Sequence, residues 1–391
     1  MTPISDTKRK DKEFVANTYG RFDIEIVSGD GSYLYDDKGK KYIDLATGIA
    51  VNTFGVCDKE WIAAVSEQLG RFQHTSNLYY SSPMANLAEL LCKKTGARRV
   101  FFGNSGAEAN ECAIKVARKW AQDTKGEGDY NIITLKNSFH GRTITTLKAT
   151  GQDVFHKDFG PFPEGFLYAE ANNLDSVEEL LKNNKCCAVM FEPVQGEGGV
   201  VALDYDFVSG LSALAKKYGV LLIADEVQTG NGRSGTLYAY MQYSIAPDVV
   251  TTAKGLGGGL PIGAAMLFER VENTLTPGSH GSTFGGNPIA AAGAVNIIKR
   301  LTDEVLLGVR ERSKLIFDTL CGAKGIKSVS GLGLMIGIET EKDSSVVLAK
   351  CMDRGILPIK AKNKIRLLPA LNIPIELLKE ALEIIKEAAA E

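Results

Sequence analysis

Short apolar runs alternate with helical spacing of apolar residues through the middle of the chain. The runs at 100–102, 132–135, 187–191, 220–224 and 248–253 have the length and composition of buried strands. Helical spacing follows the first run and precedes the fourth. Because strands that alternate with helices form parallel sheets covered on both faces, this pattern predicts an α/β fold between about residues 100 and 268.

The two ends of the chain show a different pattern. Near the N-terminus, a turn at 36–39 between two short apolar runs predicts a hairpin. After a loop at 277–288 that is rich in Gly, Ser and Thr, helical spacing at 290–301 and 305–321 leads into shorter strand and helix patterns. We therefore expect a separate, smaller α+β domain at the C-terminal end.

These patterns predict a division of the chain into three parts. The large domain, which would hold the active site, is expected at 46–290, and the small C-terminal domain at 291–391. An N-terminal segment, 1–45, is expected to pack with the small domain.

Composition excludes several classes of protein. The 391 residues include 45 basic and 47 acidic ones, so no bulk positive charge favours nucleic acid. No apolar run is long enough to cross a membrane, and the N-terminus lacks the apolar core of a signal peptide. Seven scattered cysteines without a C-x-x-C pair indicate neither a metal site nor a disulfide framework. We expect a cytoplasmic protein.

An aspartate and a lysine follow two of the predicted core strands. Asp225 comes after the run at 220–224, and Lys254 comes after the run at 248–253. Open α/β sheets bind their ligands at this end of the strands. A desolvated lysine can form a Schiff base, and a buried carboxylate needs a cationic partner such as a protonated pyridine nitrogen. Together they indicate pyridoxal phosphate (PLP).

Each of these signals has a simpler explanation when it is taken alone. An apolar run that ends in Asp225 and Glu226 also occurs in nucleotide hydrolases, but these need a G-x-x-x-x-G-K-[ST] motif that the chain lacks. Lys254 could be a solvated loop residue. Ser105, which has Glu108 three residues later, could cap a helix without binding phosphate.

Six motifs occur together in one order: NSGAEAN (104–110), FHGR (139–142), EPVQGEGG (192–199), DEVQ (225–228), KG (254–255) and GSHGSTFGGNP (278–288). In this arrangement the chain resembles the class III PLP-dependent aminotransferases over nearly its whole length. The resemblance implies the type I fold of PLP-dependent transferases, in which a large domain with a mostly parallel sheet adjoins a smaller α+β domain. It also implies a homodimer whose subunits share their active sites.

The resemblance assigns roles to individual residues. Lys254 would form the Schiff base and move the proton, and Asp225 would hold the pyridine nitrogen protonated. The other residues expected to bind the cofactor are Gly106, Ala107, Phe139, Glu226, Val227, Gln228 and Thr283, the last of them acting across the subunit boundary. The residues expected to bind substrate are Arg142, Ser282, Glu197 and Arg366. No metal is expected.

The resemblance also implies the substrates. The expected reaction transfers the terminal amine of N2-acetyl-L-ornithine to 2-oxoglutarate, giving N-acetyl-L-glutamate 5-semialdehyde and L-glutamate, a step of arginine biosynthesis. Arg142 would bind the distal carboxylate, and Arg366 the α-carboxylate of glutamate. Glu197 would neutralise Arg366 when no carboxylate is bound there. Ornithine, 4-aminobutyrate and succinyl-diaminopimelate are alternative amines.

Two other classes of protein fit less well. A nicotinamide dehydrogenase would need G-x-G-x-x-G after an early strand, which is missing. A binding module without activity would not need both Lys254 and Asp225. Two departures from the family stand out: Ala107 replaces a common Thr, and the turn at 55–59 lacks the two histidines that the family often has.

Overall fold

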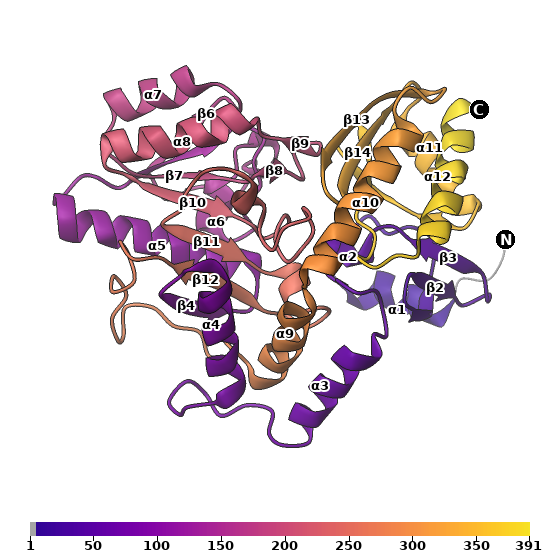
Figure 1. The fold of residues 1–391 in the computed structure, drawn as a ribbon, viewed down its shortest axis with the longest axis horizontal. Helices are drawn as coiled ribbons and strands as arrows, with labels where there is room; N and C mark the ends of the chain where they lie inside the picture. The colour runs from indigo at the N-terminus through magenta and orange to yellow at the C-terminus, as the bar shows by residue number, and fades with distance from the viewer. Residues whose placement is uncertain (1–4) are drawn as a thin grey trace.

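The computed structural model describes residues 5–391 (Figure 1). Its largest sheet has seven strands in the order β4-β12-β11-β10-β7-β5-β6. Their bounds are Arg99–Gly103, Gly263–Leu267, Val249–Thr252, Leu221–Asp225, Cys186–Phe191, Asn131–Leu135 and Phe166–Ala169 in that order. All neighbouring pairs are parallel except those of β12, which runs antiparallel to β4 and β11. The predicted mostly parallel α/β sheet is confirmed.

Helices cover both faces of this sheet. In the order of the chain, the helices of this part are α3 (Lys59–Leu69), α4 (Ser82–Thr95), α5 (Gly106–Lys125), α6 (Ile144–Ala149), α7 (Leu174–Asn183), α8 (Tyr205–Tyr218) and α9 (Pro288–Arg300). In β10, Leu221 and Ile223 pack in the same cluster as α5, whereas Leu222 and Ala224 pack with residues of α7 and α8. Successive side chains of a strand alternate between the faces, so two cores form from one apolar run.

The same alternation decides where the end of β10 points. Asp225 follows Leu221 and Ile223 at a spacing of two, so its side chain lies on the α5 face. Thr251 of β11 is two residues after Val249, which packs on that face as well. The side chains of Asp225 and Thr251, at the ends of β10 and β11, therefore face the first turns of α5.

The C-terminal part forms a second, antiparallel sheet. It has the strand order β13-β14-β17-β16, with bounds Ile326–Leu332, Met335–Thr340, Lys364–Leu367 and Ile359–Ala361. Its helices are α10 (Asp303–Leu320), α11 (Ser344–Asp353) and α12 (Ile375–Ala390). They lie at the end of the molecule opposite α7 and α8, where the C-terminus and the strands β2 and β3 are also found (Figure 1). The expected α+β arrangement of this part is confirmed.

A further four-stranded sheet joins the two ends of the chain. It has the order β1-β2-β3-β15, with bounds Ile26–Asp30, Tyr33–Asp36, Lys41–Asp44 and Ile356–Leu357. The hairpin of β2 and β3 confirms the predicted turn, and β15 pairs in parallel with β3. The boundaries of the three predicted domains stay a prediction.

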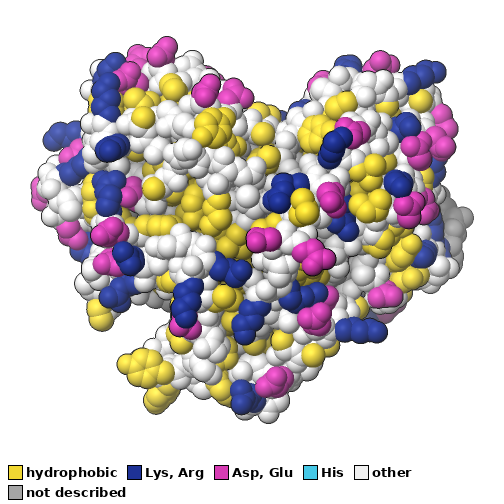
Figure 2. All heavy atoms as spheres, viewed as in Figure 1, with side chains coloured by type: hydrophobic (Ala, Val, Ile, Leu, Met, Phe, Trp, Pro, Cys, Tyr) yellow, Lys and Arg dark blue, Asp and Glu magenta, His cyan; other side chains and the backbone are white. Residues whose placement is uncertain are grey.

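The smaller elements complete the fold. They are α1 (Asp6–Phe14), α2 (Thr47–Ala50) and the two-stranded β8 (Val194–Gln195) and β9 (Val201–Ala202). Within residues 5–391, no helix has the length and apolar character that crossing a membrane requires. In the same range, no group of three His, Cys, Asp or Glu side chains could hold a metal ion. The space-filling view shows a notch between the α7–α8 side and the α11–α12 side (Figure 2).

Candidate active site

The carboxyl ends of three neighbouring strands carry the candidate catalytic groups. Strand β10 ends at Asp225, β7 is followed by Glu192, and β11 leads through Ala253 to Lys254. The parallel register of these strands brings their ends to one edge of the sheet. Asp225 and Lys254 therefore lie at the same edge of the sheet, as expected.

Lys254 is held in an unusual backbone conformation. Its φ is +48°, which is strained for a residue with a side chain. Asn231 stabilises the approach to it, because its Nδ2 donates to Thr252 Oγ1 at 2.9 Å and to the Ala253 carbonyl at 3.1 Å. Burial lowers the pKa of the Lys254 amine, and the nearby Arg366 lowers it further, against the opposing charges of the carboxylates around it. A larger fraction of the amine is therefore neutral.

The turn after Lys254 is fixed by distant parts of the chain. Thr53 Oγ1 donates to the Gly255 carbonyl at 2.8 Å, and Trp61 Nε1 donates to the Gly257 carbonyl at 3.1 Å. A Cβ at residue 257 would lie 2.0 Å from the Leu260 carbonyl oxygen, so only glycine fits there. Residues near the N-terminal end thus anchor the loop that carries the candidate nucleophile.

Asp225 is surrounded by hydrogen-bond donors. Its Oδ2 lies 2.7 Å from His140 Nδ1 and accepts from Asn110 Nδ2 at 2.7 Å. Its Oδ1 accepts from the Val227 N–H at 3.0 Å. The carboxylate is almost fully buried, with 3% of its surface exposed. The Asn110 amide and the Val227 N–H donate to this carboxylate, and His140 Nδ1 lies within hydrogen-bond distance of it.

The beginning of α5 offers N–H groups close to this carboxylate. Ser105 is the N-cap, and its Oγ accepts from the Glu108 N–H at 3.2 Å, as the capping pattern predicts. The Gly106 and Ala107 N–H groups lie in the first turn, where helices lack internal acceptors. A Cβ at residue 106 would lie 2.6 Å from Val227 Cγ1. Glycine at this position therefore lets Val227 pack against the helix start.

Phe139 and Arg142 occupy the loop between β5 and α6. The Phe139 N–H donates to Glu192 Oε2 at 2.9 Å, and its ring meets Phe155 edge-on at 5.8 Å between centroids. Arg142 is exposed, and its guanidinium carbon lies 4.3 Å from the Phe155 ring centre and 5.5 Å from that of Phe139. Burial raises the pKa of Glu192 well above its ordinary value, and the charge of Asp225 adds to this.

Arg366 on β17 reaches the site from the C-terminal sheet. Its Nη1 donates to Glu197 Oε1 at 2.7 Å and to Gln228 Oε1 at 3.0 Å. The Arg366 side chain is 3% exposed, whereas Glu197 is 30% exposed. This ion pair was expected from the sequence, and the additional bond to Gln228 was not. Gly196 makes room for it, because a Cβ there would lie 2.4 Å from Gln228 Oε1.

Three further predicted site residues, Ser282, Thr283 and Glu226, make no contact in one chain that assigns them a role. Ser282 accepts from Asn104 Nδ2 at 3.1 Å, and Thr283 is exposed in the 277–288 loop. Glu226 is buried, and its carboxylate accepts from Thr229 Oγ1 at 2.5 Å and from the Tyr240 N–H at 2.6 Å. Both Glu226 oxygens are thus used within the protein, and its role toward the cofactor stays a prediction.

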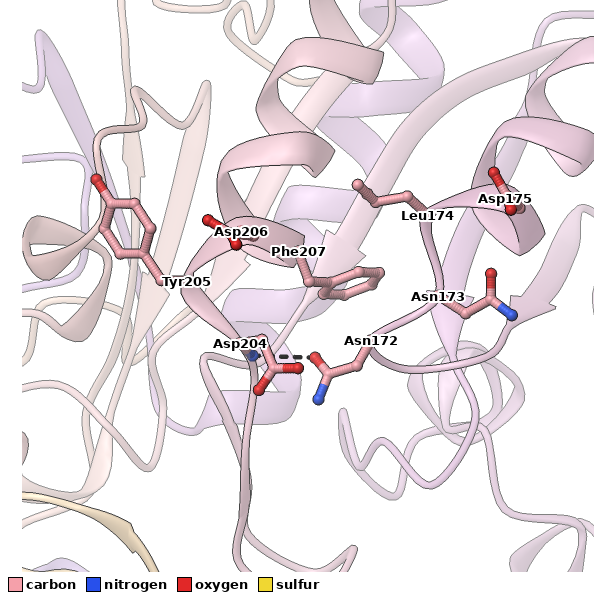
Figure 3. Close-up of a pocket in the computed structure, with 8 residues that line it drawn as sticks. All are labelled: Asn172, Asn173, Leu174, Asp175, Asp204, Tyr205, Asp206 and Phe207. Atoms are coloured by element: carbon pink, nitrogen blue, oxygen red, sulfur yellow. Dashed lines mark hydrogen bonds between the residues drawn. The ribbon is translucent and has the colours of Figure 1, made fainter.

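A separate cavity of about 580 Å³ lies between the N-termini of α7 and α8 (Figure 3). Its lining residues are Asn172, Asn173, Leu174, Asp175, Asp204, Tyr205, Asp206 and Phe207. Three acidic side chains and no basic one line it, so it is a poor place for a phosphate group. It shares no residue with the cluster around Lys254 and is not the candidate active site.

The residues around Lys254 fit PLP. Burial lowers the pKa of the Lys254 amine, which favours condensation with an aldehyde, and the N–H groups in the first turn of α5 suit the phosphate. Among residues 5–391, the buried Asp225 has one charged or chargeable partner within 4.0 Å, namely His140. A protonated ring nitrogen would complete this arrangement by supplying a cation.

The structure adds residues that the sequence did not single out as functional. Asn110 and Thr251 contact Asp225, and Asn231 braces the backbone before Lys254. Asn110 and His140 stand inside motifs already recognised, so the motifs contained the signal. Thr251 and Asn231 gave no signal, because a threonine in a strand and an asparagine in a turn are common.

Comparisons with known proteins agree with this geometry. The family model for class-III aminotransferases matches residues 14–389. The acetylornithine aminotransferase of Haemophilus ducreyi is 46% identical over 386 residues, which cover 98% of both chains. The succinylornithine transaminase of Salmonella newport is 43% identical over 97% of this chain and 95% of that one.

A solved structure matches as well. The ornithine aminotransferase of Toxoplasma gondii, described with PLP at its active site, is 32% identical and superimposes with a TM-score of 0.93. The match covers 98% of this chain and 94% of that one. The family model, the relatives and the meeting of Asp225 and Lys254 at one edge of the sheet agree, and this chain belongs to the class-III aminotransferases, a PLP-dependent family.

Proposed function

We propose that the enzyme transfers the terminal amine of N2-acetyl-L-ornithine to 2-oxoglutarate, as a homodimer in the cytoplasm. The products would be N-acetyl-L-glutamate 5-semialdehyde and L-glutamate. The observation that carries this proposal is the pairing of buried Arg366 with Glu197 at 2.7 Å. The 46% identical acetylornithine aminotransferase of Haemophilus ducreyi supports the choice of amine.

Bound PLP would supply an aldehyde that condenses with amines and a ring that withdraws electrons from the substrate carbon. The chain's own residues would do the rest. Lys254 Nζ would take the proton from the carbon that bears the amine, which its lowered pKa favours. Asp225 would hold a proton on the ring nitrogen, and Val227 and Phe139 would pack against the two ring faces.

Two basic groups would distinguish the two amines. In acetylornithine the reacting amine is far from the carboxylate, whereas in glutamate it is next to the α-carboxylate. Arg142, exposed on the loop beside Phe155, would bind the distal carboxylate. Arg366 would bind the α-carboxylate of glutamate bidentately. With acetylornithine bound, Glu197 would keep the charge of Arg366 paired.

A homodimer is supported by apolar side chains that one chain leaves uncovered. In the loop between α3 and α4, Leu78 is 86% and Tyr79 is 70% exposed, and Tyr80 is fully exposed. Hydrophobic side chains protrude at the lower edge of the molecule, where this loop lies (Figures 1 and 2). Exposed apolar groups of this kind mark interaction surfaces. Thr283, exposed in the 277–288 loop, would then act across the boundary.

We also propose the division into an N-terminal segment (1–45), a large PLP-binding domain (46–290) and a small domain (291–391). The pairing of β15 with β3 supports a common body for the two ends of the chain.

N2-succinyl-L-ornithine is a second candidate amine. Relatives named succinylornithine transaminase are 42 to 43% identical to this chain over nearly its full length. The two amines differ only in the acyl group on the α-nitrogen.

The test is a half-reaction titration of the PLP-loaded enzyme. Acetylornithine, succinylornithine, ornithine, 4-aminobutyrate and succinyl-diaminopimelate are added separately, and the loss of the visible absorption band is followed. We expect acetylornithine to give the largest rate constant divided by its half-saturation concentration. A larger value for ornithine or 4-aminobutyrate would contradict the proposed substrate while leaving the family assignment intact.

A further inference from the structure

Asn110 interrupts an otherwise apolar face of α5. The residues of this helix that pack against the large sheet include Ala113, Ile114, Ala117 and Ala121, at helical spacing from residue 110. Asn110 is 1% exposed, so its amide is buried among these groups. A polar group in such a place is unfavourable unless all its hydrogen bonds are made.

Every polar atom of the Asn110 side chain has a partner. Its Oδ1 accepts from Thr251 Oγ1 at 2.7 Å. Its Nδ2 donates to the His140 carbonyl at 2.8 Å and to Asp225 Oδ2 at 2.7 Å. The amide thus links three elements at the sheet edge: β11, the loop before α6 and the end of β10.

The partners also fix which way the amide faces. A rotation by 180° would place Oδ1 against the His140 carbonyl and the Asp225 carboxylate, which are both acceptors. Thr251 has one hydroxyl hydrogen to donate. Its Oγ1 lies 2.7 Å from Asn110 Oδ1 and 3.5 Å from Asp225 Oδ1, so the hydrogen bond to Asn110 is the stronger one. By donating to Oδ1, Thr251 turns both Nδ2 hydrogens toward those acceptors.

We propose that Asn110 and Thr251 are positioning residues that act in series: the Thr251 hydroxyl orients the Asn110 amide, and the amide holds the Asp225 carboxylate in the orientation that receives the ring nitrogen of PLP. This inference rests on the proposed role of Asp225. His140 Nδ1 shares Asp225 Oδ2 with Asn110, and the Val227 N–H holds Oδ1. Without Asn110 the carboxylate keeps these two partners but can turn about them.

A matched pair of variants at residue 251 tests the first step. Thr251→Val keeps the side-chain shape and removes the hydroxyl, whereas Thr251→Ser keeps the hydroxyl. PLP is titrated into each apoenzyme, and the visible circular dichroism of the bound cofactor is recorded as a measure of how rigidly it is held. We expect Thr251→Val to weaken PLP binding about tenfold, because the Asn110 amide loses the donor that orients it toward Asp225, and to reduce the dichroism. The PLP affinity of Thr251→Ser is expected to stay within about twofold of that of the parent enzyme, because this variant keeps the hydroxyl.

A double-variant cycle tests the series arrangement. Asn110→Leu and Asn110→Ala should each weaken PLP binding by about tenfold or more. Adding Thr251→Val to either should change the affinity by less than about twofold, because the hydroxyl bonds Asn110 Oδ1 at 2.7 Å and lies 3.5 Å from Asp225 Oδ1, a weak contact. Thermal unfolding of each apoenzyme identifies a variant that is not folded, and the two Asn110 variants provide independent measurements.

Three results separate the possible failures. Equal PLP affinities for Thr251→Val and Thr251→Ser would overturn the inference. So would a further tenfold loss from Thr251→Val when Asn110 is already replaced. If Asp225→Asn binds PLP as tightly as the parent and gives the same dichroism, the proposed role of Asp225 itself is wrong.

Discussion

At the residue scale, three buried acidic side chains each have different hydrogen-bond partners. Asp225 accepts from Asn110 Nδ2. Glu192 accepts from the Phe139 N–H, and Glu226 accepts from Thr229 Oγ1 and the Tyr240 N–H. Burial raises the pKa of Glu192 and of Glu226, and the charge of Lys254 opposes this only in part at Glu192. Asp225 differs from both in accepting from the side-chain amide of Asn110.

Glu226 predicts a dependence of stability on pH. Burial raises its pKa from 4.5 to about 7. The unfolded chain loses this proton at a lower pH than the folded one, so the stabilisation present at low pH is lost as the pH rises from about 4.5 to 7. Between pH 5 and pH 8, Glu226→Gln should gain about 2–3 kcal/mol of unfolding free energy relative to the parent.

Urea unfolding of both apoenzymes at the two pH values measures this gain. Glu269→Gln, which removes the charge of an exposed side chain after β12, serves as the control. A difference between parent and Glu226→Gln that is the same at pH 5 and pH 8 would contradict the buried, protonated Glu226.

Arg366 predicts unequal losses in the two half-reactions. Arg366→Ala removes a group that would bind the α-carboxylate of glutamate, so the rate of the glutamate half-reaction should fall about 100-fold at low substrate. The acetylornithine half-reaction should fall less than about tenfold, because Glu197 pairs with Arg366 in that state. Single-turnover absorbance changes measure both.

Lys364 provides the matched control for Arg366. It lies on the same strand, two residues earlier, and donates to Ser330 Oγ at 2.8 Å. Lys364→Ala should affect neither half-reaction. Equal losses for both substrates in Arg366→Ala would remove the argument for two separate clamps.

At this scale, the sequence predicts groups whose chemistry is conspicuous. Asp225 and Lys254 could be recognised because charged residues directly follow apolar strands. Asn110 and Thr251 could not be assigned a role, since their function depends on which face of a helix and a strand meet. Glu226 was expected at the cofactor from its place in the DEVQ motif; its carboxylate accepts from Thr229 and Tyr240, and its role toward the cofactor stays a prediction.

At the scale of elements, the start of α5 brings the strand ends and the helix N–H groups together. The helix can approach Val227 closely because residue 106 has no Cβ. The departure at residue 107 is compatible with this arrangement, because a backbone N–H does not depend on the side chain. The helix start therefore works through its backbone and the absence of bulk.

Gly106→Ala should consequently weaken PLP binding. The added Cβ would lie 2.6 Å from Val227 Cγ1 and 2.9 Å from Cγ2, so Val227, which is proposed to pack against the ring, would have to shift. We expect a loss in PLP affinity of about tenfold, which corresponds to about 1.4 kcal/mol. Titration of the apoenzyme measures it.

Gly308 in α10 is the matched control for this substitution. A Cβ there would meet the end of the flexible Arg312 side chain at 2.7 Å. Gly308→Ala should leave PLP affinity unchanged and raise stability by about 0.5–1 kcal/mol, as expected for a helix interior. A Gly106→Ala enzyme that binds PLP like the Gly308→Ala enzyme would contradict the close contact with Val227.

Element predictions succeeded where periodicity was strong. The strands β5, β7 and β10 begin and end within one residue of the predicted runs at 132–135, 187–191 and 220–224, and α5 and α8 lie where helical spacing was found. Strand β12 was missed because its sequence, GAAML, is short and lacks β-branched residues. The turn at 55–59 keeps its structure without the family's histidines, since Asp58 Oδ1 caps α3 at the Trp61 N–H.

At the scale of the whole molecule, residues far apart in sequence complete the site. Arg366 comes from the C-terminal sheet, and Thr53 and Trp61 hold the turn after Lys254. These pairings could not be derived from local patterns, because nothing in a strand's own sequence names its distant partner. The resemblance predicted the role of Arg366, and it did not predict the supports at Thr53 and Trp61.

If the exposed loop between α3 and α4 forms the dimer interface, a charged substitution in it should weaken the dimer. Tyr80→Glu places a charge on the most exposed aromatic side chain of this loop, so we expect weaker association and loss of activity at low protein concentration. Light scattering coupled to gel filtration measures the mass. Val346→Glu, on a half-exposed residue of α11, should leave the dimer intact. An unchanged mass for Tyr80→Glu at all concentrations would place the interface elsewhere.

The central claim is that Lys254 is the residue that binds the cofactor covalently. Borohydride reduction of the PLP-loaded enzyme makes this linkage permanent, and mass spectrometry of the peptides then locates it. The account predicts a single modified lysine at position 254, and no modification at this site in Lys254→Ala. A modification on another lysine of the parent enzyme, or none, would contradict the assignment of the active site.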